Sequence, residues 1–441
     1  MYVRASNLLL AWLLFVSVSA HANVIAELAN SARVELSSHA DYFTEDPPSS
    51  SRDVDERRLF VLNRLEVDAS TWVGENWAVD VGAYVDVSTP RQGERFSNSP
   101  TDDDPTVPYF DLTRLAVRYD TYEYALLLGK SDVSVGATDL YSPVDRFEST
   151  NFSNPLHAID RGRWQLSYTR YLENSQLRFF ALPIAEAGIG PPEDSRWRSA
   201  AGSDVFFDQT TQGEMQLRNN HPQHWDYLLM WDWSMAGADF FMGAHHGSSA
   251  YPVARQRQAP TPVNPQPDLI IEYPSATSGM AGFVATFDSL RVHGELLHQN
   301  VEGDRDQSLS RYVLGGSYRE TEWANRLDLN EVKLMLEYSD EVIHDEQDAE
   351  GYVQDSRPAR PFPQTLLARL DVIVDGELTF WGAISDNFRE GDGSYMLGAT
   401  YDWSDALQLD LRAVSFSGDD GTQFGRWRDN DHITAGLRYT F

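Results

Sequence analysis

The sequence predicts an all-β fold: a transmembrane antiparallel β-barrel of about 18 strands, with short periplasmic turns and long extracellular loops. Three observations support this prediction. Apolar and polar residues alternate with a period of two along many segments, for example from Trp77 to Ser88. No segment of comparable length shows a convincing helical period of 3.6 residues. Short and long connections alternate between the predicted strands, as the two ends of such a barrel require.

The alternation places eighteen strands along the chain, with boundaries accurate to a few residues. They lie near residues 33–43, 57–71, 76–88, 109–119, 123–130, 163–172, 175–183, 224–235, 237–247, 279–287, 289–298, 310–320, 329–339, 364–375, 376–386, 393–403, 405–416 and 431–441. An even count brings both termini to the periplasmic side. A soluble sandwich also has alternating strands, but it gives no reason for loops to be sorted by length.

The composition excludes several other classes of protein. The 441 residues include 67 Asp and Glu against 35 Lys and Arg, a formal net charge of -32, which argues against a nucleic-acid partner. There is no Cys, so the chain has no disulfide, no thiolate zinc site and no Cys nucleophile. Only one long apolar run exists, at the N-terminus, whereas a helical membrane protein needs about 20 apolar residues for each span.

That N-terminal run predicts export. Residues 8–18 read LLLAWLLFVSV after Arg4, and residues 20–22 (AHA) form a small-x-small cleavage pattern. We therefore expect a signal peptide at residues 1–22, followed by a single barrel domain at residues 23–441 in the outer membrane. An uncleaved anchor is the alternative, although the run is short for a span.

The last strand carries the most specific signal. The chain ends LRYTF, with Tyr439 and Phe441 at alternate positions. This ending resembles the terminal strand of bacterial outer-membrane barrels, which the barrel-assembly machinery reads. The resemblance implies that Tyr439 and Phe441 form an assembly signal. It also implies that this machinery, outer-membrane lipid and lipopolysaccharide are partners of the chain.

A second resemblance lies in Gly129-Lys130 and in the segment from Gly136 to Asp145, GATDLYSPVD. The segment is similar to a strand and loop of alginate-export-type eighteen-stranded porins, in which a glycine and a basic residue end the strand before a G-x-x-D…P-x-D loop. The Arg-Gln that usually follows the strand glycine is Lys-Ser here, and the usual Trp is Val135. The resemblance implies the fold and a channel role, but not alginate as the substrate.

The residues that line the interior follow from the inward phase of the strands. Cations on neighbouring strands form one arc and carboxylates on the next strands form another, which resembles the transverse field of a porin constriction. We predict that the pore is lined by Arg114, Arg118, Arg163, Arg178, Asp226, Asp232 and Asp239. The alternative is a ladder of Arg–carboxylate pairs that braces the wall.

The connection at residues 131–162 is one of the three longest, and it mixes apolar with polar residues. Apolar side chains in an extracellular loop need shelter from water, and the barrel interior is the nearest shelter. We expect this loop to fold inward and to narrow the pore, with Asp139 and Asp145 among the constriction residues. Cations around a narrow passage would then favour anions.

Sequence motifs for catalysis are absent: there is no G-x-S-x-G, no H-E-x-x-H and no phosphate-binding loop. We expect neither a cofactor nor a metal site, and we interpret acidic clusters such as residues 102–104 as solvated loops, although they could hold Ca²⁺. The favoured function is a porin-like channel for polar or anionic small solutes or saccharides, not an enzyme. The alternatives are an export channel for an acidic, alginate-like exopolysaccharide and, in another class, a barrel enzyme or an adhesin.

The terminal strand yields a testable prediction. Deleting Phe441 should reduce insertion into the outer membrane but leave secretion across the inner membrane intact, because the assembly signal is read after export. Fractionation of cells that express the intact or the truncated chain measures both steps. Equal insertion of the two chains would contradict the prediction.

Overall fold

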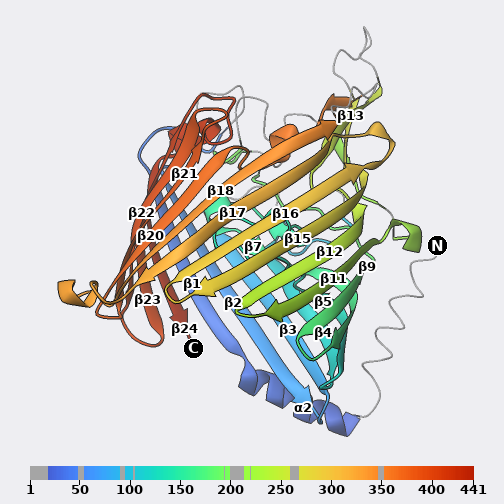
Figure 1. Cartoon of the computed structure of the whole chain (residues 1–441). Coiled ribbons are helices and arrows are strands. Elements are labelled where there is room, and N and C mark those ends of the chain that lie inside the picture. The colour runs from blue at the N-terminus through green and yellow to red at the C-terminus, as the bar shows by residue number, and fades with distance from the viewer. Residues whose placement is uncertain are drawn as a thin grey trace.

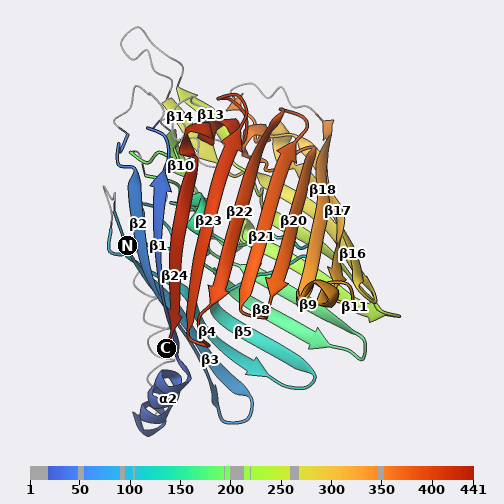
Figure 2. The same ribbon diagram turned by 90° about the vertical axis from the view of Figure 1, so that its left-hand side faces the viewer.

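The computed structural model describes residues 18–47, 54–89, 95–102, 105–192, 194–198, 213–218, 220–258, 268–345 and 352–441. Eighteen antiparallel strands form a closed barrel, and Figures 1 and 2 show their common tilt. These strands are β1 (Arg33–Phe43), β2 (Leu59–Val73), β3 (Trp77–Ser88), β4 (Phe110–Asp120), β5 (Tyr124–Ser131), β8 (Arg163–Tyr171), β9 (Ser175–Leu182), β11 (Asp226–Met235), β12 (Ala238–Ser248), β15 (Ser275–Phe287), β16 (Leu290–Val301), β17 (Ser308–Glu320), β18 (Glu331–Asp345), β20 (Thr365–Val374), β21 (Leu378–Asn387), β22 (Asp392–Asp402), β23 (Leu407–Ser417) and β24 (His432–Thr440).

The prediction of an eighteen-stranded barrel is confirmed, and the barrel closes between its first and last strands. β1 pairs with β24, for example Leu36 with Tyr439 and Ala40 with Ala435. The two largest boundary errors are in β15 and β18. β15 begins at Ser275 and not at residue 279, and β18 ends at Asp345 and not at residue 339. The acidic residues 340–345 therefore continue a strand, and Glu341 in this stretch accepts hydrogen bonds from two arginines instead of facing solvent.

The barrel has a short-turn end and a long-loop end. At the short-turn end, residue pairs with left-handed backbone make tight hairpins, such as Ala236-Gly237 (φ 50° and 83°) and Asp375-Gly376 (φ 48° and 78°). Positive φ at both central positions matches the right-handed twist of the flanking strands. The sorting by length is less strict than predicted, because residues 388–391 make a short connection at the long-loop end.

Smaller elements lie in the long loops and beside the barrel. A four-stranded sheet covers part of the long-loop end, and a two-stranded ribbon lies within residues 132–162. These strands are β10 (Gly213–Gln216), β13 (Val253–Gln258), β14 (Asp268–Glu272), β19 (Tyr352–Gln354), β6 (Thr150–Asn151) and β7 (Ile159–Asp160). Short 3-10 turns are η1 (Pro155–His157), η2 (Pro222–His224), η3 (Glu302–Asp304), η4 (Asn325–Leu327), η5 (Arg357–Ala359) and η6 (Gly425–Asn430).

Helix α2 (Val18–Ser31) lies at the short-turn end, as Figure 1 shows. Thr71 of β2 donates a hydrogen bond to Glu27 of this helix. The predicted cleavage point after residue 22 falls within α2, and residues 1–17 of the predicted signal peptide lie outside the described residues. Across the described part of the chain, no helix is both long enough and apolar enough to span a membrane.

The two faces of the barrel wall differ as the alternation requires. Every barrel strand has at least one large apolar side chain that is well exposed on its outer face, such as Val85 (40% exposed) and Val87 (56%) on β3. The alternate residues Tyr84 and Asp86 of the same strand are 1% exposed and face the interior. Because this outer apolar surface continues around the barrel, it is far larger than a soluble monomer normally exposes.

Aromatic rings form a row on the outer face near the short-turn end. Trp77, Tyr119, Tyr124 and Tyr168 come from β3, β4, β5 and β8, and neighbouring ring centroids lie 4.9, 6.0 and 6.2 Å apart. Amphipathic rings of this kind are stable at the boundary between lipid and water.

Candidate functional site

The segment at residues 132–162, called here the inner loop, connects β5 to β8 and hydrogen-bonds to inward-facing side chains across the barrel. Its first half contacts Glu295 of β16 and Glu337 of β18. Its second half contacts Asp41 of β1. A loop that is held on well-separated strands passes through the barrel interior instead of extending into solvent.

Glu337 of β18 holds the inner loop through the loop backbone. Its side chain is fully buried and accepts the backbone N–H groups of Asp139, Leu140 and Tyr141 at 2.7, 2.9 and 2.9 Å. The His293 Nε2 atom lies 2.9 Å from the same carboxylate. Three successive N–H groups on one carboxylate satisfy the loop backbone in place of a sheet ladder.

Glu295 holds the preceding turn. Its carboxylate accepts the N–H groups of Ala137 and Thr138 and, at 2.6 Å, the Ser142 hydroxyl. Gly136 has a φ of +122°, and a Cβ atom there would lie 2.6 Å from Ser142 Oγ and 2.9 Å from Glu295 Oε1. Glycine is therefore required at this position by both the backbone conformation and the close approach of the carboxylate.

Apolar packing supports the same loop. Val133, Val135, Val144 and Phe147 of the inner loop are buried against inward-facing apolar residues of the wall. Those wall residues are Phe180, Leu182, Leu228, Met230, Phe241, Met280 and Leu297. Each large side chain buried in this way contributes about 1.5–3 kcal/mol, so this contact contributes substantially to holding the loop inside.

The second half of the inner loop is fixed on β1 and β23. Asn154 donates to Asp41 at 3.2 Å, and His157 Nε2 lies 3.3 Å from the same carboxylate. Thr434 of β24 also donates to Asp41, at 2.7 Å. Arg412 of β23 contacts the His157 ring and the Leu156 carbonyl. A buried carboxylate thus anchors this half of the loop, as it does the first half.

The predicted cations lie on the inward phase of their strands, and most of them are paired with carboxylates. Arg178 makes a bidentate contact with Asp232 at 2.8 and 2.9 Å. Arg163 lies 3.4 Å from Asp226. Contacts of this kind also fit the alternative of a bracing ladder. The arrangement of these residues as a basic arc and an acidic arc around the pore remains a prediction.

The remaining predicted residues are placed in different surroundings. Arg114 contacts Asp132 at 2.6 Å. The guanidinium of Arg118 lies 5.6 Å from the ring centroid of Trp72. The Asp239 carboxylate accepts the Ser234 hydroxyl near the short-turn end, at 2.5 Å.

Of the two loop acids predicted for the constriction, Asp139 pairs with Arg291 of β16. Asp145 accepts the N–H of Val135 at 3.1 Å, within the inner loop itself. The two acids therefore hold the loop and its wall in place. Their role in solute passage remains a prediction.

At the C-terminus, the N–H of Phe441 donates to the Val34 carbonyl of β1 at 2.9 Å. The rings of Tyr439 and Phe441 lie 4.7 Å apart, and Phe441 is 69% exposed. Both residues are thus available on the outer face, next to the seam between first and last strands. Their function as an assembly signal remains a prediction.

Two features of this site were not predicted from the sequence: the apolar patch on the inner wall and the role of buried carboxylates in holding the loop. A signal for the patch exists in β11, where residues 227–231 (YLLMW) are apolar on both faces. A strand of that kind needs cover on both sides. Glu295 and Glu337 carry no comparable signal, because an inward acid on a barrel strand is ordinary.

Two acids of the inner loop have shifted protonation equilibria. Burial raises the pKa of the Glu148 carboxyl to about 7; the nearby Asp132, Asp160 and Asp145 contribute to this rise, and the N–H of Val133 opposes it. Burial also raises the pKa of Asp145, to about 6. Both acids are thus protonated more readily in the docked loop than in a solvated one.

The chain matches no protein-family model and no curated protein sequence. Similar solved structures include OccAB3 of Acinetobacter baumannii, with 12% identity, a TM-score of 0.48, and 93% of this chain and 99% of that chain covered. OccD3 (OpdP) of Pseudomonas aeruginosa has 12% identity and a TM-score of 0.46, with 93% and 90% covered. A mutant of the Rh. blastica porin has 10% identity and a TM-score of 0.42, with 93% and 99% covered. The barrel assignment rests on the strand pairing described above, and these likenesses add no functional detail.

The raised pKa values predict that docking of the inner loop depends on pH. The pKa of Glu148 is higher in the docked loop than its ordinary value of 4.5. Docking is therefore most favourable at low pH and loses stability as the pH rises through about 7, by roughly 3 kcal/mol at most. Bilayer recordings should show steady currents at pH 5 and more current fluctuation at pH 8.

The variant Glu148→Gln provides the matched test. Gln keeps an oxygen that can accept the Val133 N–H, but it does not titrate. Its current fluctuation should change less between pH 5 and pH 8 than that of the parent chain. The same pH dependence in both chains would show that Glu148 does not control the loop.

Proposed function

We propose that the chain forms a water-filled channel in the outer membrane that polar solutes cross, with the inner loop as its constriction. The observation that carries the proposal is the difference between the barrel faces: exposed large apolar side chains outside on every strand, and paired charged groups inside. Such an outer surface suits lipid, and a barrel of this strand number has room for water inside. Membrane lipid, lipopolysaccharide and the barrel-assembly machinery are its proposed partners.

The inner loop supports a constriction because it is attached on both sides of the passage. Glu295 and Glu337 hold residues 137–142, and Asp41 holds Asn154 and His157. A segment fixed in this way reduces the cross-section open to a solute. The remaining passage favours small polar or anionic solutes and saccharides over a thick polymer chain, so we rank export of an acidic exopolysaccharide second.

Charge around the passage would set its ion preference. The side chains of Arg114 and Asp132 remain 36% and 46% exposed, although they form a pair. Charges that stay in contact with interior water act on passing ions without having to be desolvated. The arginines of β4 are therefore the residues proposed to give the channel its preference for anions.

Removing the inner loop tests the constriction. Deletion of residues 138–157 should raise single-channel conductance, because the deleted segment contains the contacts to Glu337 and Asp41. Heat-modifiable mobility on gels would first establish that the barrel is folded. Unchanged conductance of a folded deletion variant would place the constriction elsewhere.

A point variant refines this test. Glu337→Gln turns one acceptor oxygen into an NH₂ group that faces backbone N–H donors, which should release part of the loop and give an intermediate conductance. Glu331→Gln on the same strand is the control, since Glu331 pairs with Arg319.

Replacing the two arginines of β4 tests charge preference. The double variant Arg114→Ala, Arg118→Ala should shift selectivity toward cations, because Asp132 and Asp68 then lose their positive neighbour. Reversal potentials in a salt gradient measure the shift. Arg170→Ala is the control, because Arg170 pairs with Glu123 at the short-turn end. Unchanged selectivity in the double variant would limit these arginines to bracing the wall.

A further inference from the structure

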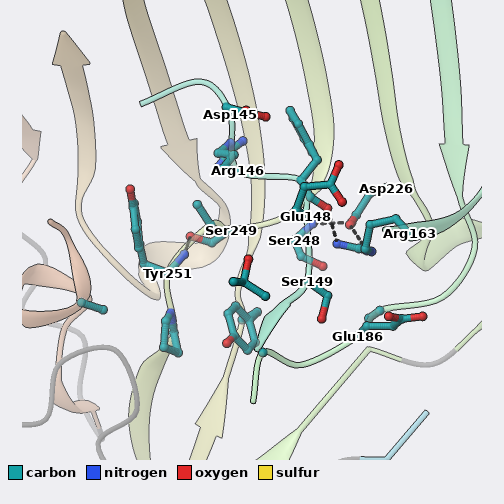
Figure 3. Close-up of a pocket in the computed structure, with 18 of the residues that line it drawn as sticks. Asp145, Arg146, Glu148, Ser149, Arg163, Glu186, Asp226, Ser248, Ser249 and Tyr251 are labelled. Atoms are coloured by element: carbon teal, nitrogen blue, oxygen red, sulfur yellow. Dashed lines mark hydrogen bonds and ion pairs between the residues drawn. The ribbon is translucent and has the colours of Figure 1, made fainter. Parts of the chain in front are cut away.

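A second feature of the interior is a cavity of about 330 Å³ near the long-loop end. It lies between the inner loop and residues 185–188, 217–218 and 248–252. Figure 3 shows Arg146, Glu148, Arg163, Ser248 and Tyr251 around it. The volume is at the lower end of the range for small-molecule sites, about 300–1,000 Å³.

The cavity wall contains polar atoms that have no protein partner. Among the described residues, the buried Arg146 Nε, Arg163 Nε, Glu148 Oε2 and Ser248 Oγ atoms make no hydrogen bond. Arg163 is only 8% exposed. Buried polar groups normally find partners, so donors and acceptors left free together on one wall indicate a place for a polar ligand.

The charged groups of the cavity wall limit the charge that a bound ligand can carry. Three guanidinium groups face five carboxylates there, namely Arg146, Arg163, Arg218, Asp145, Glu148, Asp160, Glu186 and Asp226. Because both signs of charge line the wall, an ion of either sign would lie close to groups of its own sign: an anion to the acids, and a cation to the arginines. A neutral ligand avoids both.

The chemistry of the free groups points to a ligand rich in hydroxyls. A hydroxyl both donates and accepts, so it can satisfy Arg Nε atoms and a carboxylate oxygen in the same site. The rings of Phe152, Tyr251 and Tyr273 also line the cavity and offer apolar surface to the carbon face of a sugar ring. We propose that the cavity is a binding site for a neutral saccharide on its way through the channel, an inference that rests on the proposed function.

Calorimetry of the full chain in detergent tests the site without a bilayer. The probes are maltose as the neutral saccharide, glucuronate as an acidic one, and glycine as a zwitterion. Maltose should bind, and glucuronate and glycine should bind more weakly. Ser248→Ala removes a hydroxyl that has no protein partner, so it should weaken maltose binding about three- to tenfold.

Further variants separate a real site from a folding effect. Ala250→Trp should fill the cavity and abolish binding, with gel mobility as the folding check. Tyr273→Phe removes only a hydroxyl from the wall and should weaken binding without loss of the fold. Ser289→Ala, in the exposed turn between β15 and β16, should bind as the parent chain does.

The possible outcomes are distinct. Equal maltose affinity in the parent chain, Ser248→Ala and Tyr273→Phe would overturn the site. Tighter binding of glucuronate or glycine than of maltose would overturn the ligand class. Absence of conductance in bilayers would count against the channel alone, because binding is measured independently of it.

Discussion

Hydrogen bonding of the backbone is the constraint on which the rest of this structure depends. A strand that faces an apolar environment cannot leave its N–H and C=O groups unpaired. Pairing of β1 with β24 removes the two free edges that an open eighteen-stranded sheet would have. The outer face can then be apolar around its whole circumference, because no backbone polar group is left at an edge.

Closure creates an interior that must also be satisfied, and the inner loop does this with carboxylates. Irregular backbone inside a barrel has no neighbouring strand to pair with. Glu337 and Glu295 take over that role by accepting successive N–H groups from residues 137–141. The apolar patch beneath the loop covers surface that water would otherwise contact.

The same constraint explains why the inner wall carries so many ion pairs. Strand residues on the inward phase are fixed in position, and charged groups on adjacent strands lie within reach of one another. Arg64 and Asp86 form such a pair across β2 and β3, with atoms 2.7 and 2.9 Å apart. Paired charges hold the wall together, and the less completely buried ones, such as Arg114, also remain in contact with interior water. One set of residues can therefore brace the barrel and also carry the charge on which the proposed ion preference depends.

The sequence by itself determined the number and order of the barrel strands, the direction in which their side chains point, and the place of the inner loop in the chain. These features follow from local alternation and from connection length, which need no knowledge of distant residues. The contacts of Gly136, Glu295 and Glu337 were decided only by the tertiary structure, because they join residues more than 150 positions apart. The pairing of Arg163 with Asp226 and the apolar patch under the loop also depend on the tertiary structure. Alternation along a strand predicts which way a side chain points, but only the closed barrel determines which residues it contacts.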